Sequence, residues 1–233
     1  MATAPLHSAL LQTLGQSIAN GELNPSRVLT LDEVCVRHSV SRSVARDAVG
    51  SLEALGMLES RRRVGIIVLP MNRWDVLNSQ VIRWRLNGPD RDRQLEALTL
   101  LRLGVEPIAA ASTAQHIDGS TALELRDLSL RMAEHGQAGR RAEFIELDAR
   151  FHELILTNSG NELYAALSTP VLAAINGRSE VGLMPDHPVA DAIQLHHTVA
   201  EAIVERDATT AEHAMRDILS EVRSAVAEVA APR

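Results

Sequence analysis

The stretch SVSRSVARDAVGSLEALGMLESRRRVGIIVLP, residues 39–70, decides the fold of the N-terminal part of this chain. Residues 41–56 place apolar side chains at helical spacing, between a serine at the start and Gly56 at the end. Two short runs that alternate like strands follow, and a basic corner with Gly65 separates them, which predicts a β-hairpin. A helix that leads directly into a hairpin is typical of a winged helix-turn-helix.

Two further helices are predicted before this stretch. Residues 7–20 repeat leucine and isoleucine at helical spacing. Residues 31–38 form a second short helix, and Thr30 with Glu33 makes a capping box at its start. The order of helix, helix, turn, helix and hairpin predicts a winged helix-turn-helix domain over residues 1–70, a fold that places one helix in the DNA major groove.

The remainder of the chain, residues 71–233, is predicted to be all α. A short helical piece ends at Gly88-Pro89, and no segment beyond residue 70 has a convincing strand pattern. Helical apolar spacing recurs over residues 91–116, 119–136, 141–158, 160–175, 189–206 and 208–229. The sequence therefore predicts a mainly α fold, with a helical bundle after the winged domain.

Composition indicates a folded protein and excludes several classes. Hydrophobic residues make up 45% and charged residues 23% of the 233 residues, close to the average of globular proteins. Cys35 is the single cysteine, which excludes an internal disulfide framework and a cysteine-rich zinc module. The sequence has no uncharged apolar run long enough for a membrane helix and no secretory signal pattern, so we expect a cytoplasmic protein without a membrane partner.

The charge is divided unevenly along the chain. Every basic residue is arginine, and residues 1–70 hold seven arginines against six acidic residues, whereas residues 71–233 hold 16 against 24. The net charge of −7 does not exclude nucleic-acid binding, because contact with DNA is local. Aromatic residues make up only 2% of the chain, which argues against a stacking platform for single strands.

Several motifs resemble one family of bacterial transcription regulators. Val40-Ser41-Arg42, Arg46-Asp47-Ala48, the run from Leu52 to Gly56, and Gly65 resemble the DNA-binding domain of the GntR superfamily. LRLGVEPIAAASTA from Leu101, DARFHELI from Asp148 and LHHTVAEAIVERDATTAEHAMRDIL from Leu195 resemble the FadR-type effector domain, the FCD class. The resemblance implies a homodimer whose residues 71–233 bind an effector and dimerise.

Basic and small polar residues at the start of a recognition helix can contact base edges and phosphates. The candidate DNA-binding residues are Ser41, Arg42, Ser43 and Arg46 on this helix and Arg62 and Arg63 at the hairpin tip. The alternative is that they are solvated charges on an ordinary surface. Asp32 stands where many members of the family carry an arginine, and an acidic group is unfavourable near phosphate.

A carboxylate and an imidazole lie four residues apart at Asp148 and His152, so one helix face presents both. Such a pair suits Zn²⁺, Ni²⁺ or Mn²⁺, although alone it is more often an ordinary hydrogen bond. The resemblance implies a third ligand at His196 and places a fourth at Ile218, which cannot coordinate a metal. Two alternatives follow: a three-ligand site with open positions, or a degenerate site that has lost its metal.

The resemblance also implies an anion-binding role for Arg102, because an arginine can bind a carboxylate through two hydrogen bonds. The alternative is an ion pair with Glu106, four residues further along the helix. The segment WDVLNSQVIRWRL, residues 74–86, resembles the branch that responds to sugar acids such as gluconate or galactonate. We expect Trp74 and Trp84 to be packing anchors between the wing and the bundle.

Three functions are compatible with these observations. The first is a ligand-responsive regulator, a repressor as a rule in this family, that binds palindromic operator DNA and is controlled by a small carboxylate. The second is a metal-assisted enzyme built on Asp148, His152 and His196, although no general base or activated nucleophile is apparent beside them. The third is a sensor that has lost its DNA contacts.

Overall fold

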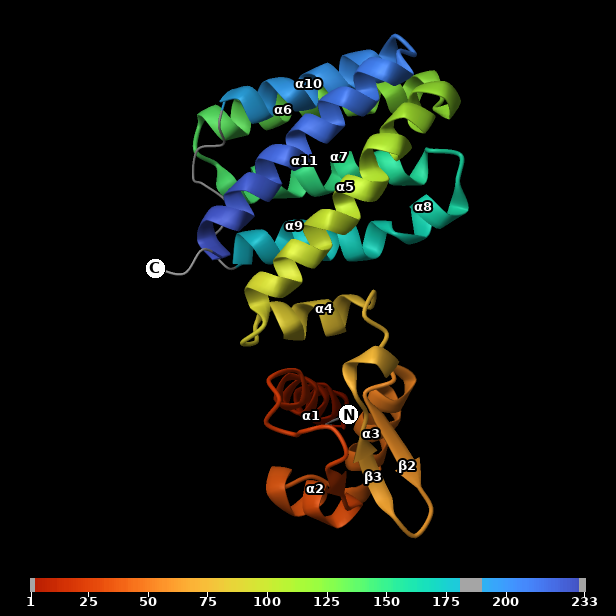
Figure 1. Cartoon of the computed structure of the whole chain (residues 1–233), viewed down its shortest axis with the longest axis vertical. Helices are drawn as coiled ribbons and strands as arrows, with labels where there is room; N and C mark the ends of the chain where they lie inside the picture. The colour runs from red at the N-terminus through yellow and green to blue at the C-terminus, as the bar shows by residue number, and fades with distance from the viewer. Residues whose placement is uncertain (1–2, 181–189, 231–233) are drawn as a thin grey trace. The chain divides into compact units, whose positions relative to one another are not determined.

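The computed structural model describes residues 3–180 and 190–230 and separates into two compact units, Met1–Arg91 and Asp92–Arg233 (Figure 1). The first unit extends past residue 70 because helix α4, Ser79–Leu86, packs against α1, Thr3–Ala19. The division of functions at residue 70 stays a prediction. Among the described residues, no helix combines the length and apolar character that crossing a membrane requires.

The first unit is a winged helix-turn-helix, and the predicted fold class is confirmed. Beside α1 and α4 it contains α2 (Leu31–His38), α3 (Arg42–Ala54), the 3₁₀ turn Met71–Arg73, and strands β1 (Val28–Leu29), β2 (Leu58–Arg61) and β3 (Gly65–Val68). The sheet is antiparallel in the order β1-β3-β2. The sequence analysis missed β1, because two residues are too short for a recognisable alternation and form a strand only by pairing with β3.

Local capping fixes the turn between α2 and α3. The hydroxyl of Thr30 accepts a hydrogen bond from the backbone N–H of Glu33, and the Glu33 carboxylate accepts one from the N–H of Thr30, which completes the expected capping box. Ser39 ends α2 in the left-handed region at φ 52°. The hydroxyl of Ser41 then caps α3 by accepting from the N–H of Val44. These short-range bonds set where the recognition helix begins.

A tryptophan joins α4 to α1. Trp84 is 2% exposed, and its indole N–H donates a hydrogen bond to the side chain of Gln12 at 2.7 Å. Gly15 lies against the ring, and a Cβ there would lie 2.4 Å from the ring carbon Cζ2 of Trp84. The indole of Trp74 donates to the carbonyl of Leu69 at 2.9 Å. Both tryptophans therefore make these hydrogen bonds inside the first unit, and the expected link to the bundle is not among them.

The second unit is all α within its described residues. Its helices are α5 (Arg91–His116), α6 (Gly119–Gln137), α7 (Arg141–Thr157), α8 (Glu162–Ala166), α9 (Ser168–Glu180), α10 (Ala190–Val204) and α11 (Ala208–Ala230). Helix α6 packs against both α7 and α10, α11 packs against α10, and α9 packs against α7 (Figure 1). One apolar cluster, which includes Phe151, Ile155 and Met215, fills the space between the helices.

Helix α5 contacts α7 through a buried hydrogen bond. The hydroxyl of Thr113 donates to the backbone carbonyl of Ile155 at 2.6 Å. Ala109, Ala110 and Ala114, on the same part of α5, are fully buried in the core of this unit. Glu106, two turns before Thr113, also contacts α7.

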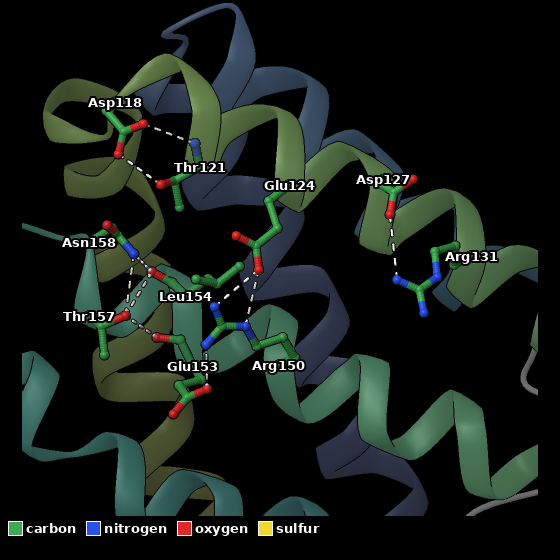
Figure 2. Close-up of polar contacts among 10 residues, drawn as sticks. All are labelled: Asp118, Thr121, Glu124, Asp127, Arg131, Arg150, Glu153, Leu154, Thr157 and Asn158. Carbon is green, nitrogen blue, oxygen red and sulfur yellow. Dashed lines mark hydrogen bonds and ion pairs between the residues drawn. The ribbon is translucent and has the colours of Figure 1, made fainter.

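The outer face of α6 and α7 carries ion pairs that are exposed to solvent (Figure 2). Arg150 pairs with Glu124 at 3.0 Å and with Glu153 at 2.9 Å, and Arg131 pairs more loosely with Asp127 at 3.6 Å. Exposed pairs of this kind contribute between about 0 and 1 kcal/mol each. They do not determine the packing of these helices, which rests on the buried face.

The segment predicted as one helix over residues 160–175 is two helices, α8 and α9, separated at Leu167. Pro170 explains the division, because a proline in a helix interior removes a hydrogen bond and collides with the preceding turn. The break places Pro170 in the first turn of α9, where proline is tolerated.

The contact between Gly15 and Trp84 gives a test of the first unit. We expect Gly15→Ala to lower the free energy of unfolding by about 1–3 kcal/mol, because the new methyl group must displace a buried indole ring. Gly50→Ala on α3 is the matched control, since nothing lies within 4 Å of its Cβ position and alanine should stabilise a helix there by about 0.5–1 kcal/mol. Urea unfolding measures both, and equal effects would contradict the packing described for Trp84.

Candidate functional site

Five charged or ionisable side chains from three helices meet inside the second unit. They are Arg102 and Glu106 on α5, Asp148 and His152 on α7, and His196 on α10, and none is more than 5% exposed. Removing so many polar groups from water is unfavourable unless each has a partner. The partners of each group therefore determine what this cluster can do.

Arg102 is paired on its own helix. Its Nε donates to one carboxylate oxygen of Glu106 at 2.5 Å, and its Nη2 donates to the other at 3.4 Å. The ion pair that the sequence left open as the alternative role of Arg102 is therefore present. Nη2 also lies 3.2 Å from Nε2 of His152, so Arg102 belongs to the cluster as well. Burial alone would raise the pKa of Glu106, but Arg102 and His152 lower it to about 2.

His152 lies between the two carboxylates. Its Nδ1 contacts a carboxylate oxygen of Glu106, and its Nε2 lies 3.4 Å from Oδ1 of Asp148. Burial opposes the charged imidazole, but the negative charge of Glu106 and the hydrogen bonds to Asp148 and Glu106 together raise the pKa of His152. Burial likewise opposes the charged carboxylate of Asp148, yet hydrogen bonds from His152 and His196 hold the pKa of Asp148 well below its usual range.

His196 completes the cluster from α10. Its Nδ1 donates to the backbone carbonyl of Ala192 at 2.7 Å, which turns Nε2 toward Oδ1 of Asp148 at 3.1 Å. The edge of the ring also meets Phe151, with ring centroids 5.3 Å apart. The neighbouring His197 faces elsewhere, toward the hydroxyl of Ser129 and the carboxylate of Glu201. The structure therefore brings His196, and not His197, to Asp148.

The donor set of this cluster fits a divalent metal. One ligand atom from each of Asp148, His152 and His196 lies within 4.8 Å of the other two. The Nδ1 atom of each histidine is engaged by an oxygen acceptor, so both Nε2 atoms face the same carboxylate oxygen. Engaging one ring nitrogen in this way orients the other for coordination, although Nε2 of His152 would have to exchange its contact with Arg102 for the metal. Two imidazoles and one carboxylate suit Zn²⁺, Ni²⁺ or Mn²⁺.

Ile218 occupies the place that the resemblance assigns to a fourth ligand. It is 3% exposed and belongs to the apolar cluster of the second unit. A metal held by the three remaining residues keeps coordination positions open. When bound, such a metal would supply a Lewis acid that can accept an oxygen of a small anion.

The candidate DNA-binding side chains of α3 lie on its exposed side. Arg42, Ser43 and Arg46 are exposed, whereas the buried side of the helix packs into the core of the first unit. The hydroxyl of Ser41 is engaged as the helix cap, where it also meets the hydroxyl of Ser43 at 2.9 Å. Arg42 pairs with Asp32 at 2.8 Å, and both side chains are well exposed. The acidic residue at position 32 thus holds Arg42 in an exposed ion pair.

The tip of the hairpin presents two exposed arginines. Arg61 is held by Glu59, which accepts hydrogen bonds from Nε at 3.0 Å and from Nη2 at 2.9 Å. Arg62 and Arg63 follow in the turn between β2 and β3, and both are exposed. Arg63 adopts the left-handed backbone conformation at φ 65°. These two arginines, rather than Arg61, extend from the wing.

The sequence analysis missed a further cationic residue of the second unit, Arg178 on α9. Its Nε atom is buried and has no hydrogen-bond partner among the described residues. The signal that could have found it is its spacing from Val171 and Ile175, because an arginine at the next core-facing position of an amphipathic helix is unusual.

The fold and these two surfaces define a winged-helix DNA-binding protein with a second, helical unit that contains a buried polar site. Residues 6–68 match the family model described as "Bacterial regulatory proteins, gntR family", and residues 97–221 match the model described as "FCD domain". The chain therefore belongs to the GntR family of bacterial transcription regulators, in the FadR-type branch that carries an FCD domain.

Curated relatives agree with this family. The Galactonate operon transcriptional repressor of Escherichia coli (strain K12) is 29% identical over 204 residues, which span 87% of this chain and 88% of the relative. The Probable D-xylose utilization operon transcriptional repressor of Paenarthrobacter nicotinovorans is 26% identical and spans 85% and 78%. Among solved structures, Streptococcus agalactiae GntR has a TM-score of 0.52 at 24% identity, covers 94% of this chain and 99% of its own, and supports the fold.

The family and the relatives are transcription regulators, so the chain is a regulator and not an enzyme. The metal-assisted enzyme that the sequence kept as an alternative finds no support in them.

The ion pair of Arg102 and Glu106 can be tested by a double-mutant cycle. We expect Arg102→Met to lower the free energy of unfolding by about 3–5 kcal/mol, because it leaves a buried carboxylate without its main partner. Glu106→Leu alone also removes the carboxylate that contacts His152, so the double variant Arg102→Met, Glu106→Leu should lose less stability than the sum of the two single variants. Urea unfolding of all three variants at pH 7 is the measurement, and additive losses would contradict the pairing.

Proposed function

We propose that this regulator is a homodimeric repressor that acts in the cytoplasm, binds a palindromic operator and releases it when a small carboxylate binds the second unit. The observation that carries the proposal is the buried cluster of Arg102, Glu106, Asp148, His152 and His196 inside an FCD domain. A folded protein rarely buries so many ionisable groups without a functional reason. The domain division at residue 70 separates DNA binding from effector binding and dimerisation.

The DNA-binding surface consists of α3 and the wing. Arg42, Ser43 and Arg46 project from the first turns of α3 and would reach base edges, with Ser41 at the helix start near a phosphate. Arg62 and Arg63 would contact the backbone or the minor groove from the wing tip. Asp32 weakens the contribution of Arg42 by holding it in an exposed ion pair.

The effector is proposed to be a sugar acid such as gluconate or galactonate. Two observations support this class: the resemblance of residues 74–86 to the sugar-acid branch, and a relative that represses a galactonate operon. A carboxylate would bind in or beside the cluster, with the open positions of a metal on Asp148, His152 and His196. The effector can change DNA binding only if its affinity differs between two arrangements of the dimer.

A mobility-shift experiment tests the function as a whole. The full chain is mixed with the DNA upstream of its own gene, with a scrambled duplex as competitor, at two salt concentrations. Specific binding that weakens with salt and is reversed by gluconate or galactonate, but not by glucose or galactose, supports the proposal. Absence of specific binding would leave the third function, a sensor without DNA contacts.

Individual arginines should have different effects on DNA binding. We expect Arg46→Ala to weaken operator binding by about 1–3 kcal/mol while it affects non-specific DNA less, as for a base contact. Arg62→Ala should weaken binding to all DNA sequences about equally. It should also reduce the slope of log affinity against log salt concentration by roughly one, as for a phosphate contact. Arg131→Ala, an exposed arginine of α6, is the control. Fluorescence anisotropy measures these three variants and Arg42→Ala, and wild-type affinity in both Arg46→Ala and Arg42→Ala would refute the assigned helix.

The proposed metal site can be tested by comparing variants of two adjacent histidines, His196 and His197. After chelator treatment, we expect the protein to bind Zn²⁺, Ni²⁺ or Mn²⁺, and His196→Ala to weaken the tightest of these by more than roughly tenfold because it removes a ligand. His197→Ala should bind as the wild type does, since this ring contacts Ser129 and Glu201 instead. Calorimetry with each metal decides the matter. Equal losses in both variants would place the metal elsewhere.

A further inference from the structure

Arg178 occupies a core-facing position of α9. Val171, Ala174 and Ile175 form the buried side of this helix, each at most 4% exposed, and Arg178 lies three residues beyond Ile175 on the same side. Helix α9 packs against α7, the helix that carries Asp148 and His152. Arg178 thus occupies a position at which the spacing of the buried residues predicts an apolar side chain.

The Nε atom of Arg178 is buried and has no hydrogen-bond partner among the residues that the structure describes, although the residue as a whole is only half-buried. Burial and the positive charge of Arg102 lower the pKa of Arg178 to about 10, while Asp148 opposes this shift. Arg178 therefore remains charged at neutral pH, and it lies close enough to Arg102 and Asp148 to feel both charges.

The printed contacts of the cluster do not include Arg178. Glu106 pairs with Arg102, and Asp148 is engaged by the two histidines, so each carboxylate already has its partners. With neutral histidines, the two arginines balance the two carboxylates in formal charge. A divalent metal at Asp148 would add positive charge, and a small anion is the ligand that would then balance the site.

We propose that Arg178, and not Arg102, is the residue that binds the carboxylate of the effector through paired hydrogen bonds. This inference rests on the proposed function, in which the effector is a small carboxylate. Arg102 is instead a positioning residue: it holds Glu106, which contacts His152. The planar guanidinium matches the two oxygens of a carboxylate, and an arginine without a competing partner can use both donors.

The proposed role of Arg178 predicts a melting temperature that can be measured without the effector. Without the effector, Arg178 is a half-buried charge whose Nε has no hydrogen-bond partner among the described residues, whereas Arg102 belongs to an ion pair. Arg178→Met should therefore melt at the same temperature as the wild type or higher, while Arg102→Met melts lower. Arg131→Met, which removes an exposed arginine, controls for the loss of one positive charge. A clearly lower Tm for Arg178→Met would overturn the inference, because it would show that the guanidinium supports the fold.

Ligand binding supplies the second test. The full chain is titrated with gluconate, galactonate, lactate and citrate, with and without Zn²⁺, and thermal shift and calorimetry report binding. For every carboxylate that binds the wild type, Arg178→Met should bind on the order of 10- to 100-fold more weakly, and Arg178→Lys should recover part of the loss. Arg131→Met should bind as the wild type does.

The outcomes separate the inference from the proposed function. Binding of a carboxylate to Arg178→Met with wild-type affinity would overturn the role of Arg178 and leave the carboxylate effector standing. Absence of binding by all four carboxylates to the wild type would overturn the carboxylate effector itself. Loss of binding in Arg178→Met with a Tm at or above that of the wild type supports the inference.

Discussion

The second unit depends on the contact of His152 with two buried carboxylates. Glu106 reaches it from α5, Asp148 reaches it along α7, and His196 from α10 contacts Asp148 in turn. Each of these groups would be expensive to bury alone, so the three helices are stable together only when the charged groups meet. The apolar residues around them fill volume, but the charges require a particular rotation of each helix about its axis.

The same region of α5 carries apolar and polar contacts of the core. Ala109, Ala110 and Ala114 are buried, and the hydroxyl of Thr113 donates to the carbonyl of Ile155 on α7. Glu106, two turns before Thr113, contacts His152 of α7. The polar contacts of α5 with α7 therefore lie within the apolar core.

Sequence patterns predicted most of the fold, because the elements concerned are long or carry their own caps. The capping box at Thr30 and the hairpin around Gly65 are examples, and both are local signals. Strand β1 was not predictable, since two residues adopt strand geometry only through their partner. The break before α9 could have been read from Pro170, whose effect on a helix is also local.

The candidate site divides in the same way. Spacing along α7 predicted that Asp148 and His152 share a face, and the family resemblance supplied His196. The role of Arg102 could not be settled, because a spacing of four residues is equally compatible with an ion pair and with a ligand contact. Only the distances show that Glu106 already binds it. The spacing of Arg178 from Val171 and Ile175 could have marked it as an unusual core-facing residue, but only the structure shows that its Nε lacks a hydrogen-bond partner among the described residues.

A protein with an acidic net charge can bind DNA, because the contact depends on local charges that are not already paired. The same distinction between paired and unpaired charges separates Arg178 from Arg102. An ionic contact depends on which charges remain unpaired at the surface or in the buried cluster, and not on the sum of charges over the chain. Arg42 and Arg61 are held by Asp32 and Glu59, so these two count for less near phosphate than their number suggests. In the second unit, Arg102 is likewise held. Ion pairing inside the protein thus determines which arginines can act on a partner.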